Sequence, residues 1–338
     1  MHIGSGHIMR CLTLADALRA RGAECLFICQ ERPGHMMDLI EGRGYPAYRL
    51  PVLGADSPAD ARQTIPILSE LRPEWLVVDH YSLDSGWEDD VRPQCRSLFV
   101  IDDLVRAHRC DLLLDQTFGR STETYRTKVP ADCAVLAGSE YALLRPEFAE
   151  LRDRSLKRRS APGLRTVLVS MGGVDQFNIT SVVLDALGVA PLPSGCSLKV
   201  VMGRRAPWLN EVRRQAREMP WSTRVFVDVT DMASLMAEAD FAIGAGGSTS
   251  WERCCLGLPS FVVVTADNQR EAAAALHRAG AAYVVTDAAK IAPALLAAIG
   301  EQVRDADSAL RVSTAASAVT DGYGTQRVLS HLCEATLG

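Results

Sequence analysis

The sequence predicts a two-domain α/β protein built on parallel β-sheets. The chain has 338 residues, which suits two domains of about 150 residues each. Short apolar runs alternate with segments of helical periodicity, and this alternation is typical of strand–helix–strand units with a parallel sheet. Several apolar runs end directly in polar side chains, as strands do at the ligand-binding edge of an open parallel sheet.

Composition excludes several classes of protein. Hydrophobic residues make up 48% and charged residues 23% of the chain, which is ordinary for a globular protein and not for a disordered or fibrous one. The 36 basic and 41 acidic residues give a formal charge of −5, which argues against a dedicated nucleic-acid-binding protein. No apolar run approaches the roughly 20 residues of a membrane span, so we expect no membrane insertion.

Ten cysteines are scattered along the chain, and no Cys-x-x-Cys pair occurs. This spacing argues against a zinc site and is typical of reduced thiols that serve as small apolar residues. The N-terminus lacks a basic segment followed by an apolar one, so no signal peptide is expected. We therefore expect a cytoplasmic protein without a bound metal.

The first domain is predicted over residues 1–155. Helices are expected at 7–21, which Gly22 should end, and at 36–42, and a strand is expected at 25–29. Three further strands are expected at 75–78, 98–101 and 112–114, followed by Asp79-His80-Tyr81, Asp102-Asp103 and Asp115-Gln116 respectively. Because parallel strands end at one edge of a sheet, we expect these polar groups to share a functional edge.

The second domain is predicted over residues 163–315, followed by a C-terminal helix over 316–338. Its strands are expected at 166–170, 198–202, 224–227, 241–243 and 261–264, with helices between them. Asp231 is expected to cap a helix over 232–239. The residue pattern from 306 to 337 predicts one or two helices. A charged, non-periodic stretch at 150–163 is interpreted as a linker or a solvated helix end.

A glycine turn, Gly4-Ser5-Gly6, opens the first predicted helix, and His7 follows directly. Free N–H groups at a helix start attract anions, and the helix dipole disfavours a charged imidazole there. A neutral histidine is what a general base needs, although a turn that only caps the helix explains the same residues. No apolar run precedes this turn, so we expect the first strand of the domain to be missing.

The stretch from Gly244 to Glu252 is the most specific one in the chain. It combines three glycines, hydroxyl side chains and a helix start after a strand, which suits a phosphate group. Glu252 falls in the first turn of the following helix and could accept both ribose hydroxyls of a nucleotide, or simply complement the helix dipole. The loop is neither a Walker loop nor a dinucleotide fingerprint. Another glycine turn, Met171-Gly172-Gly173, follows the first strand of this domain.

Other side chains leave alternatives open. Asn268 could cap the helix that begins at Arg270 or hydrogen-bond a sugar, and Tyr81 could contact a sugar or pack half-buried. Adjacent residues usually point apart, so Asp102 and Asp103 are not expected to form a catalytic carboxylate pair. The chain also lacks the Gly-x-Ser-x-Gly elbow of serine hydrolases.

Taken together, these stretches resemble one family. The segments concerned are 3–12 (IGSGHIMRCL), 79–81 (DHY), Asp102-Asp103 with His108 and Asp111, 141–148 (YALLRPEF), 171–173 (MGG) and 244–252. They resemble the UDP-2,4-diacetamido-2,4,6-trideoxy-β-L-altropyranose hydrolases of pseudaminic acid biosynthesis, which supplies a nonulosonic acid for bacterial surface glycans. The resemblance spans most of the chain up to about residue 270, and the ordered set of motifs is more specific than any one loop.

The resemblance implies a GT-B fold, in which two Rossmann-like domains flank a cleft, as in the glycosyltransferase that makes lipid II. It implies metal-independent hydrolysis of the bond between C1 and the UDP oxygen, with inversion. The products would be UDP and 2,4-diacetamido-2,4,6-trideoxy-L-altrose. The family's catalytic histidine matches His7, its tyrosine after Asp-His matches Tyr81, and its asparagine before glutamine matches Asn268.

We therefore expect His7 to deprotonate the attacking water. The nucleotide is assigned to Gly246, Gly247, Ser248, Thr249 and Glu252. The rest of the substrate is assigned to Gly6, Arg10, Tyr81, Gly172, Gly173 and Asn268. We expect no cofactor, a small UDP-sugar as the binding partner, and a monomer, which suits a hinged two-domain enzyme.

Three alternatives stay open. A GT-B glycosyltransferase would pass the sugar to an acceptor, a binding protein would hold the UDP-sugar without turnover, and a nucleotide-sugar epimerase is a weaker third. No basic or apolar patch for a membrane-bound acceptor is evident in residues 1–150, which favours water as the acceptor.

Overall fold

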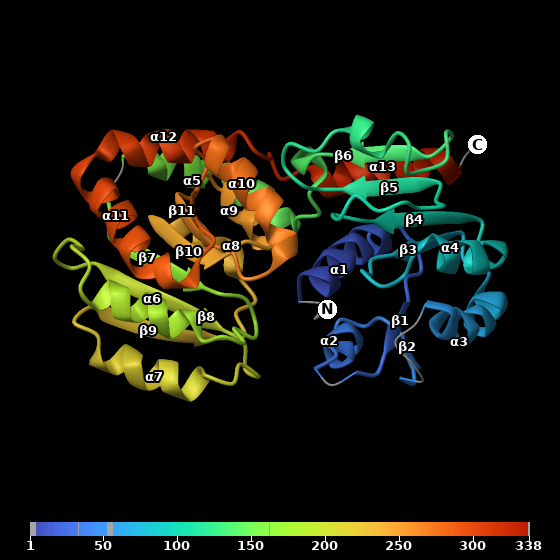
Figure 1. Ribbon diagram of the computed structural model, residues 1–338, viewed down its shortest axis with the longest axis horizontal. Coiled ribbons are helices and arrows are strands. Elements are labelled where there is room, and N and C mark those ends of the chain that lie inside the picture. Colours follow the sequence, from blue (N-terminus) through green and yellow to red (C-terminus); the bar gives the residue numbers. More distant parts are fainter. Residues whose placement is uncertain (1–4, 33, 53–56, 162, 337–338) are drawn as a thin grey trace. The chain divides into compact units, whose positions relative to one another are not determined.

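The computed structural model describes residues 5–32, 34–52, 57–161 and 163–336, which fold into two units with parallel sheets (Figure 1). The first unit contains the described residues up to Leu143 and those from Gly324 onward, and the second unit runs from Leu144 to Tyr323. This organisation confirms the α/β class and the parallel sheets expected from the sequence.

The first unit holds two separate parallel sheets. Its elements are α1 (Ser5–Arg19), β1 (Phe27–Gln30), α2 (Met37–Gly42), β2 (Ala47–Leu50), α3 (Ser57–Leu71), β3 (Trp75–Val78), α4 (Ser85–Val91), β4 (Ser97–Ile101), β5 (Leu112–Asp115), β6 (Ala134–Ala137) and α13 (Gly324–Thr336). Strands β3, β4, β5 and β6 form a sheet in that order, and β1 pairs with β2 in a sheet of two strands.

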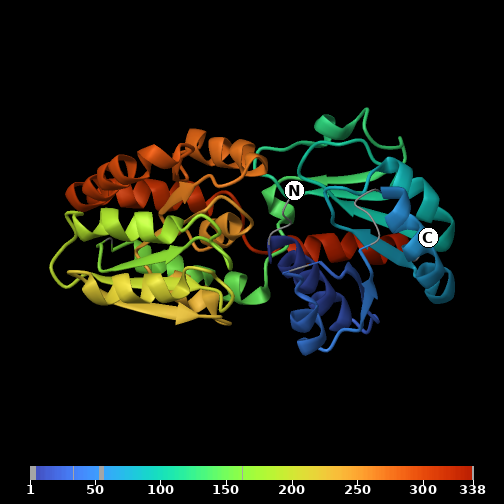
Figure 2. The same cartoon turned by 60° about the horizontal axis from the view of Figure 1, so that its bottom comes forward.

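The central strands of the larger sheet are continuous apolar runs. Leu98 to Ile101 on β4 and Leu112 to Leu114 on β5 are all buried, as expected where helices cover both faces of a parallel sheet. Helix α13 supplies part of that cover, since its Val328 and Leu332 pack in one core cluster with Phe99. Figures 1 and 2 both show this red helix lying beside strands of the first unit.

Helix α1 carries the N-terminal motif. The predicted helix over 7–21 is confirmed, although it begins earlier, so Gly6 lies in its first turn and not in a preceding loop. Gly22, with a φ of 89°, follows its end as expected, because only glycine adopts this left-handed conformation at little cost. Gly4 and the predicted absence of a first strand fall on residues 1–4, which lie outside the described residues.

The second unit is built on one six-stranded parallel sheet of order β12-β11-β10-β7-β8-β9. Its elements are α5 (Pro146–Arg159), β7 (Thr166–Ser170), α6 (Ile179–Gly188), β8 (Ser197–Met202), α7 (Leu209–Glu218), β9 (Ser222–Val227), α8 (Met232–Glu238), β10 (Phe241–Ala245), α9 (Thr249–Cys255), β11 (Ser260–Val263), α10 (Arg270–Arg278), β12 (Tyr283–Val285), α11 (Ile291–Arg304) and α12 (Ala306–Ser317).

The five strands predicted for this domain are confirmed within a few residues. The buried side chains of β7, β8, β10 and β11 join those of α6 and α11 in one core, exemplified by Phe241, Val183 and Ile299. The Asp231 carboxylate accepts a hydrogen bond from the Ser234 N–H, so it caps α8 as predicted. Because all six strands are parallel, the loops after β7, β8, β9, β10 and β11 leave from one edge.

The division between the units differs from the predicted boundaries at 155 and 163. Helix α5 occupies most of the stretch that was interpreted as a linker or a solvated helix end, and it belongs to the second unit. Its Arg159 is buried and donates hydrogen bonds to the carbonyls of Met236, Ala239 and Leu256. This basic side chain therefore satisfies the free carbonyls at the ends of neighbouring helices.

The tail forms two helices, as the pattern over 306–337 allowed, and the C-terminal helix expected over 316–338 begins later, at Gly324. Helix α12 stays with the second unit, whereas α13 belongs to the first. Gly322, with a φ of 90°, lies between them, and a Cβ there would come within 2.8 Å of the Cys255 sulfur and 3.1 Å of the Ala149 Cβ. A tight turn that only glycine can make thus interrupts the helical pattern.

None of the helices in the described ranges combines the length and the apolar character needed to cross a bilayer. The ten cysteines, all of which are described, are free thiols.

Candidate functional site

His7 lies on the first turn of α1 and meets the loop that follows β3. Its Nδ1 atom is 2.5 Å from Oδ1 of Asp79, and both side chains are nearly buried, with 10% and 3% of their surface exposed. A carboxylate can only accept at this contact, so the imidazole donates from Nδ1. The carboxyl end of β3 therefore supplies a charged partner for the predicted base.

Arg10 lies one helical turn after His7 and contacts the same carboxylate. Its Nε donates to Oδ2 of Asp79 at 2.6 Å, and its Nη2 donates to Oδ1 at 2.5 Å. Burial would raise the pKa of the Asp79 carboxyl, but the Arg10 guanidinium outweighs burial and holds that pKa well below its usual range. Asp79 is therefore ionised at neutral pH.

Tyr81 contacts His7 from the side. The two rings meet edge to face, with centroids 4.6 Å apart and an interplanar angle of 88°. The Tyr81 hydroxyl donates to Oδ2 of Asp103 at 3.1 Å, and the same oxygen is 3.6 Å from Nη1 of Arg10. The structure thus brings together the predicted residues His7, Arg10 and Tyr81.

The first unit holds a second set of charged groups, which are buried: Glu88, Asp102 and His108. His108 Nδ1 is 2.6 Å from Glu88 Oε1, and its Nε2 is 3.5 Å from Asp102 Oδ1. Burial lowers the pKa of the His108 imidazole, but Asp102 and Glu88 outweigh burial and raise it to about 9. Asp102 also accepts a hydrogen bond from Arg106 Nε at 2.8 Å, so Asp102 stabilises this part of the fold and does not pair with Asp103.

The glycine loop of the second unit follows β10 and leads into α9. A Cβ on Gly244 would collide with the Arg253 guanidinium, whereas a Cβ on Gly247 would meet open space. Arg253 is buried and donates to the Ala245 carbonyl at 3.0 Å, to Ser250 Oγ at 2.9 Å and to Thr249 Oγ1 at 3.2 Å. Arg253 therefore fixes the start of the loop. Its guanidinium occupies the space that a Cβ on residue 244 would need, so glycine is required there.

Glu252 lies on α9, and its side chain is 18% exposed. Burial raises the pKa of the Glu252 carboxyl to about 7, although Arg145 and Arg253 oppose the rise. Nη2 of Arg145 is 3.8 Å from Oε1 of Glu252, and Nη1 donates to the Thr230 carbonyl at 3.1 Å. Arg145 thus connects the segment 141–148 to the predicted ribose-binding carboxylate.

The remaining predicted residues of the second unit also follow the carboxyl ends of strands in its six-stranded sheet. Gly172 and Gly173 follow β7, and Gly172 has a φ of 87°. Asn268 lies in a 3₁₀ turn over Asp267–Gln269, directly before α10. A Cβ on Gly246 would come within 3.2 Å of Gln269, so the loop after β10 and the turn after β11 adjoin.

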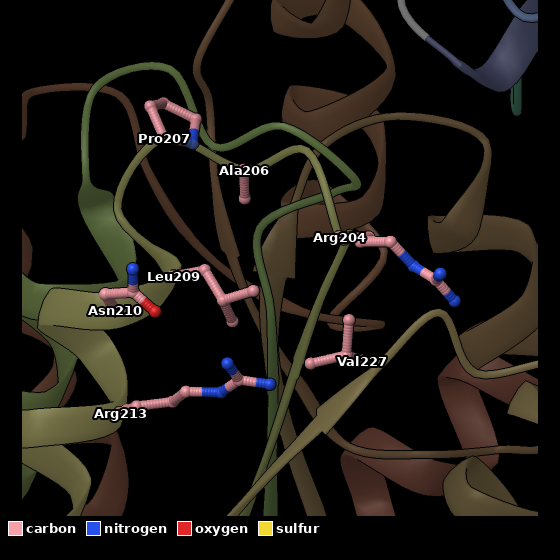
Figure 3. Close-up of a pocket in the computed structure, with 7 residues that line it drawn as sticks. All are labelled: Arg204, Ala206, Pro207, Leu209, Asn210, Arg213 and Val227. Carbon is pink, nitrogen blue, oxygen red and sulfur yellow. The ribbon is translucent and has the colours of Figure 1, made fainter.

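A separate hollow of about 500 Å³ lies beside β9 and the start of α7. It is lined by Arg204, Ala206, Pro207, Leu209, Asn210, Arg213 and Val227. Figure 3 shows the Arg213 guanidinium extending beneath Leu209 toward Val227. Arg204 donates from Nε to Asp228 at 2.8 Å, and no predicted site residue lines this hollow.

Sequence reasoning overlooked three residues. Asp79 stands in the Asp79-His80-Tyr81 motif without a predicted role, and its place directly after an apolar strand is the available signal. Arg145 and Arg253 gave no such signal, because their contacts to Glu252 and to the glycine loop follow only from the fold. In the described ranges, no three His, Cys, Asp or Glu side chains are grouped as a metal site would require.

Comparison with known proteins identifies relatives of both the sequence and the fold. Residues 166–325 match the model of the glycosyltransferase family 28 C-terminal domain. The UDP-2,4-diacetamido-2,4,6-trideoxy-β-L-altropyranose hydrolase of Campylobacter jejuni is 26% identical over 279 residues, which cover 82% of this chain and 93% of that protein.

Two other relatives are longer than this chain. It spans 55% of the uncharacterized protein MJ1062 of Methanocaldococcus jannaschii, at 21% identity over 80% of this chain. It spans 45% of the spore coat polysaccharide biosynthesis protein SpsG of Bacillus subtilis, at 32% identity over 46% of this chain.

A solved structure establishes the fold. The crystal structure of Acinetobacter baumannii MurG superposes with a TM-score of 0.72 at 16% identity, covering 98% of this chain and 97% of that one. The chain therefore has the GT-B fold, as the family resemblance implied.

Proposed function

We propose that this chain, which has the GT-B fold and is a relative of the Campylobacter jejuni hydrolase, hydrolyses UDP-2,4-diacetamido-2,4,6-trideoxy-β-L-altropyranose. Water would replace UDP at the anomeric carbon C1 with inversion. The products are UDP and 2,4-diacetamido-2,4,6-trideoxy-L-altrose, an intermediate of pseudaminic acid biosynthesis. The observation that carries the proposal is the similarity to the hydrolase over 93% of that protein's length.

His7 is the proposed general base. With its Nδ1 proton directed at Asp79, the lone pair on Nε2 is the one available to a water molecule. Nε2 takes a proton from the water molecule as the water oxygen bonds to C1. The bond between C1 and the UDP oxygen breaks, and its electron pair leaves with UDP. A positioned base typically contributes about 10²–10⁴-fold to such a step.

The second unit is proposed to hold UDP. The Glu252 carboxylate would accept hydrogen bonds from the ribose hydroxyls, and the N–H groups of Gly246, Gly247, Ser248 and Thr249 would face the diphosphate. Fixed N–H donors stabilise the charge that develops on a leaving diphosphate without a metal ion. The buried Arg253 supports this role because it donates to the Ala245 carbonyl at the start of the loop, while a Cβ on Gly247 would meet open space.

Gly6, Tyr81, Gly172, Gly173 and Asn268 stay assigned to the rest of the substrate as proposals. Tyr81 has the strongest support among them, because its ring touches the imidazole of His7. A sugar bound for attack at C1 would lie against the same imidazole.

A glycosyltransferase is the second candidate, favoured by the match of residues 166–325 to a glycosyltransferase family 28 domain. The two activities share a UDP-sugar and differ only in what attacks C1. A transferase releases UDP only when its acceptor is present, whereas a hydrolase needs no acceptor. A protein that only binds UDP-sugars would release no UDP under either condition.

Incubation of the purified chain with the UDP-altropyranose separates these activities. The proposal expects stoichiometric UDP release without an acceptor, at a rate that excess EDTA does not change. A rate that EDTA abolishes and Mg²⁺ restores would contradict the metal-independent mechanism. Dependence on an added acceptor would replace the hydrolase by a transferase.

A further inference from the structure

We infer that Asp79 and Arg10 act on the reaction through His7, as positioning residues: Asp79 fixes the imidazole, and Arg10 fixes Asp79. The inference rests on the proposed role of His7 and deepens it. It also changes the role of Arg10, which was predicted from the sequence to bind substrate.

The contact between His7 and Asp79 sets the tautomer of the imidazole. A neutral imidazole carries one proton, and the nitrogen beside a carboxylate is the one that keeps it. Oδ1 of Asp79 lies 2.5 Å from Nδ1, so Nε2 is left as the acceptor. Were the proton on Nε2 instead, His7 would present a donor to water and could not act as its base.

Arg10 is oriented toward carboxylates on two sides. Its Nε and Nη2 form a bidentate pair with Asp79, and its Nη1 is 3.6 Å from Asp103. Arg10 is only 6% exposed. A planar guanidinium in this fork geometry fixes both the position and the plane of a carboxylate, so Arg10 is better placed to hold Asp79 than to reach a ligand.

The sequence spacing allows one helix to serve both contacts. His7 and Arg10 are three residues apart on α1 and therefore lie on the same face, one turn from each other. Nη2 of Arg10 is 3.1 Å from Nδ1 of His7, because both groups donate toward the same Oδ1 of Asp79. Tyr81 adds a contact to the ring, which limits rotation of the imidazole about its remaining torsion.

The first test reads the tautomer directly. The chain is labelled with ¹⁵N-histidine, and the ring nitrogens of His7 are assigned by comparison with His7→Asn. Long-range ¹H–¹⁵N spectra at about pH 8.5 should show the Nδ1–H form in the wild type and its loss or mixture with the Nε2–H form in Asp79→Asn. An Nε2–H form of His7 in the wild type would overturn the inference, whether or not Asp79→Asn folds.

Kinetics supply the second test. Asp79→Asn should lower kcat about 10²-fold or more, within the contribution of a positioned base, while KM changes less than about threefold. Arg10→Lys should keep more of kcat than Arg10→Met, because lysine retains the charge but not the bidentate geometry. A rise in KM with kcat unchanged in both Arg10 variants would instead assign Arg10 to substrate binding and overturn its positioning role.

Asp60→Asn is the matched control. Asp60 is a buried carboxylate of the same unit that accepts hydrogen bonds from Gln30 and Trp87. Asp60→Asn should lower the melting temperature and leave kcat unchanged. An equal loss of kcat in Asp60→Asn would show that Asp79 matters only for stability. Absence of UDP release by the wild type would refute the proposed function, while the tautomer measurement would still decide the role of Asp79.

Discussion

Nδ1 of His7 lies 2.5 Å from Oδ1 of Asp79, a residue 72 positions further along the chain. The pair joins the first turn of α1 to the loop after β3, and Arg10 contacts the same carboxylate. An imidazole held in this way presents one defined nitrogen, which is what a general base requires. The proposed hydrolysis depends on this nitrogen facing the attacking water.

Replacing the proposed base should stop turnover without affecting nucleotide binding. His7→Asn removes the proton acceptor, so kcat should fall by about 10²–10⁴-fold. The affinity for UDP should stay within about twofold, because the residues proposed to bind UDP belong to the second unit. Steady-state kinetics and calorimetry measure the two effects. His277→Asn, at an exposed position on α10, is the control, and a wild-type rate in His7→Asn would refute the assignment.

Binding of a UDP-sugar should strengthen as the pH rises through neutrality. With the pKa of Glu252 raised to about 7, roughly one tenth of the carboxyl groups are ionised at pH 6 and roughly nine tenths at pH 8. Ribose hydroxyls donate to the ionised form, so affinity should increase about tenfold over this range. UDP-N-acetylglucosamine is the probe, because its diphosphate diester does not titrate there.

Glu252→Gln should bind this probe weakly and with no pH dependence. Glu238→Gln, which alters an exposed partner of Lys199, should behave as the wild type does. A wild-type affinity that stays flat between about pH 6 and pH 8 would count against the ribose contact.

A methyl group at Gly247 should report whether a ligand lies against the glycine loop. A Cβ there meets no protein atom within 4 Å, so Gly247→Ala should leave the melting temperature unchanged. If the diphosphate contacts this backbone, the methyl group should weaken UDP binding about tenfold or more, equivalent to about 1.4 kcal/mol. Gly188→Ala, also without neighbours within 4 Å, should have no effect, and unchanged UDP affinity in Gly247→Ala would place the diphosphate elsewhere.

Stability of the first unit should fall as the pH rises above neutrality. Burial lowers the pKa of His108, but Asp102 and Glu88 raise it overall to about 9 from an ordinary 6.5. The stabilisation from the charged imidazole is therefore complete below about pH 6.5 and is lost as the pH rises through about 9. The loss is on the order of 3 kcal/mol, at about 1.4 kcal/mol per pKa unit.

Urea unfolding at a series of pH values measures this loss. His108→Gln cannot gain or lose the proton, so its stability should change less over the same range. Parallel pH dependences for the wild type and His108→Gln would show that other groups are responsible.

Much of the fold could be predicted because buried parallel strands are continuous apolar runs. The strands at 75–78 and 166–170 were predicted at the residues where β3 and β7 occur. Helix α5 could not be predicted, because its charged side chains suggested solvent. In the structure Arg159 is buried, because its guanidinium donates hydrogen bonds to backbone carbonyls at the ends of neighbouring helices.

The candidate site could be predicted only in part, because some of its contacts join residues that lie far apart in the sequence. His7, Tyr81 and Glu252 stand in local motifs that can be recognised from the sequence. The contact of His7 with Asp79 crosses 72 positions, and that of Arg145 with Glu252 also joins distant segments. Such pairs are fixed by tertiary packing. The place of Asp79 directly after an apolar strand marks it as a site residue, but no local pattern could identify His7 as its partner or Glu252 as the partner of Arg145.

The fate of isotopically labelled water tests the central claim most directly. The chain is incubated with the UDP-altropyranose in H₂¹⁸O without an acceptor, and the products are followed by mass spectrometry and by NMR of the anomeric proton. Attack at C1 by a water that His7 activates predicts ¹⁸O in the sugar, unlabelled UDP and the α anomer as the first product. Label in UDP, the β anomer first, or no release of UDP would contradict it.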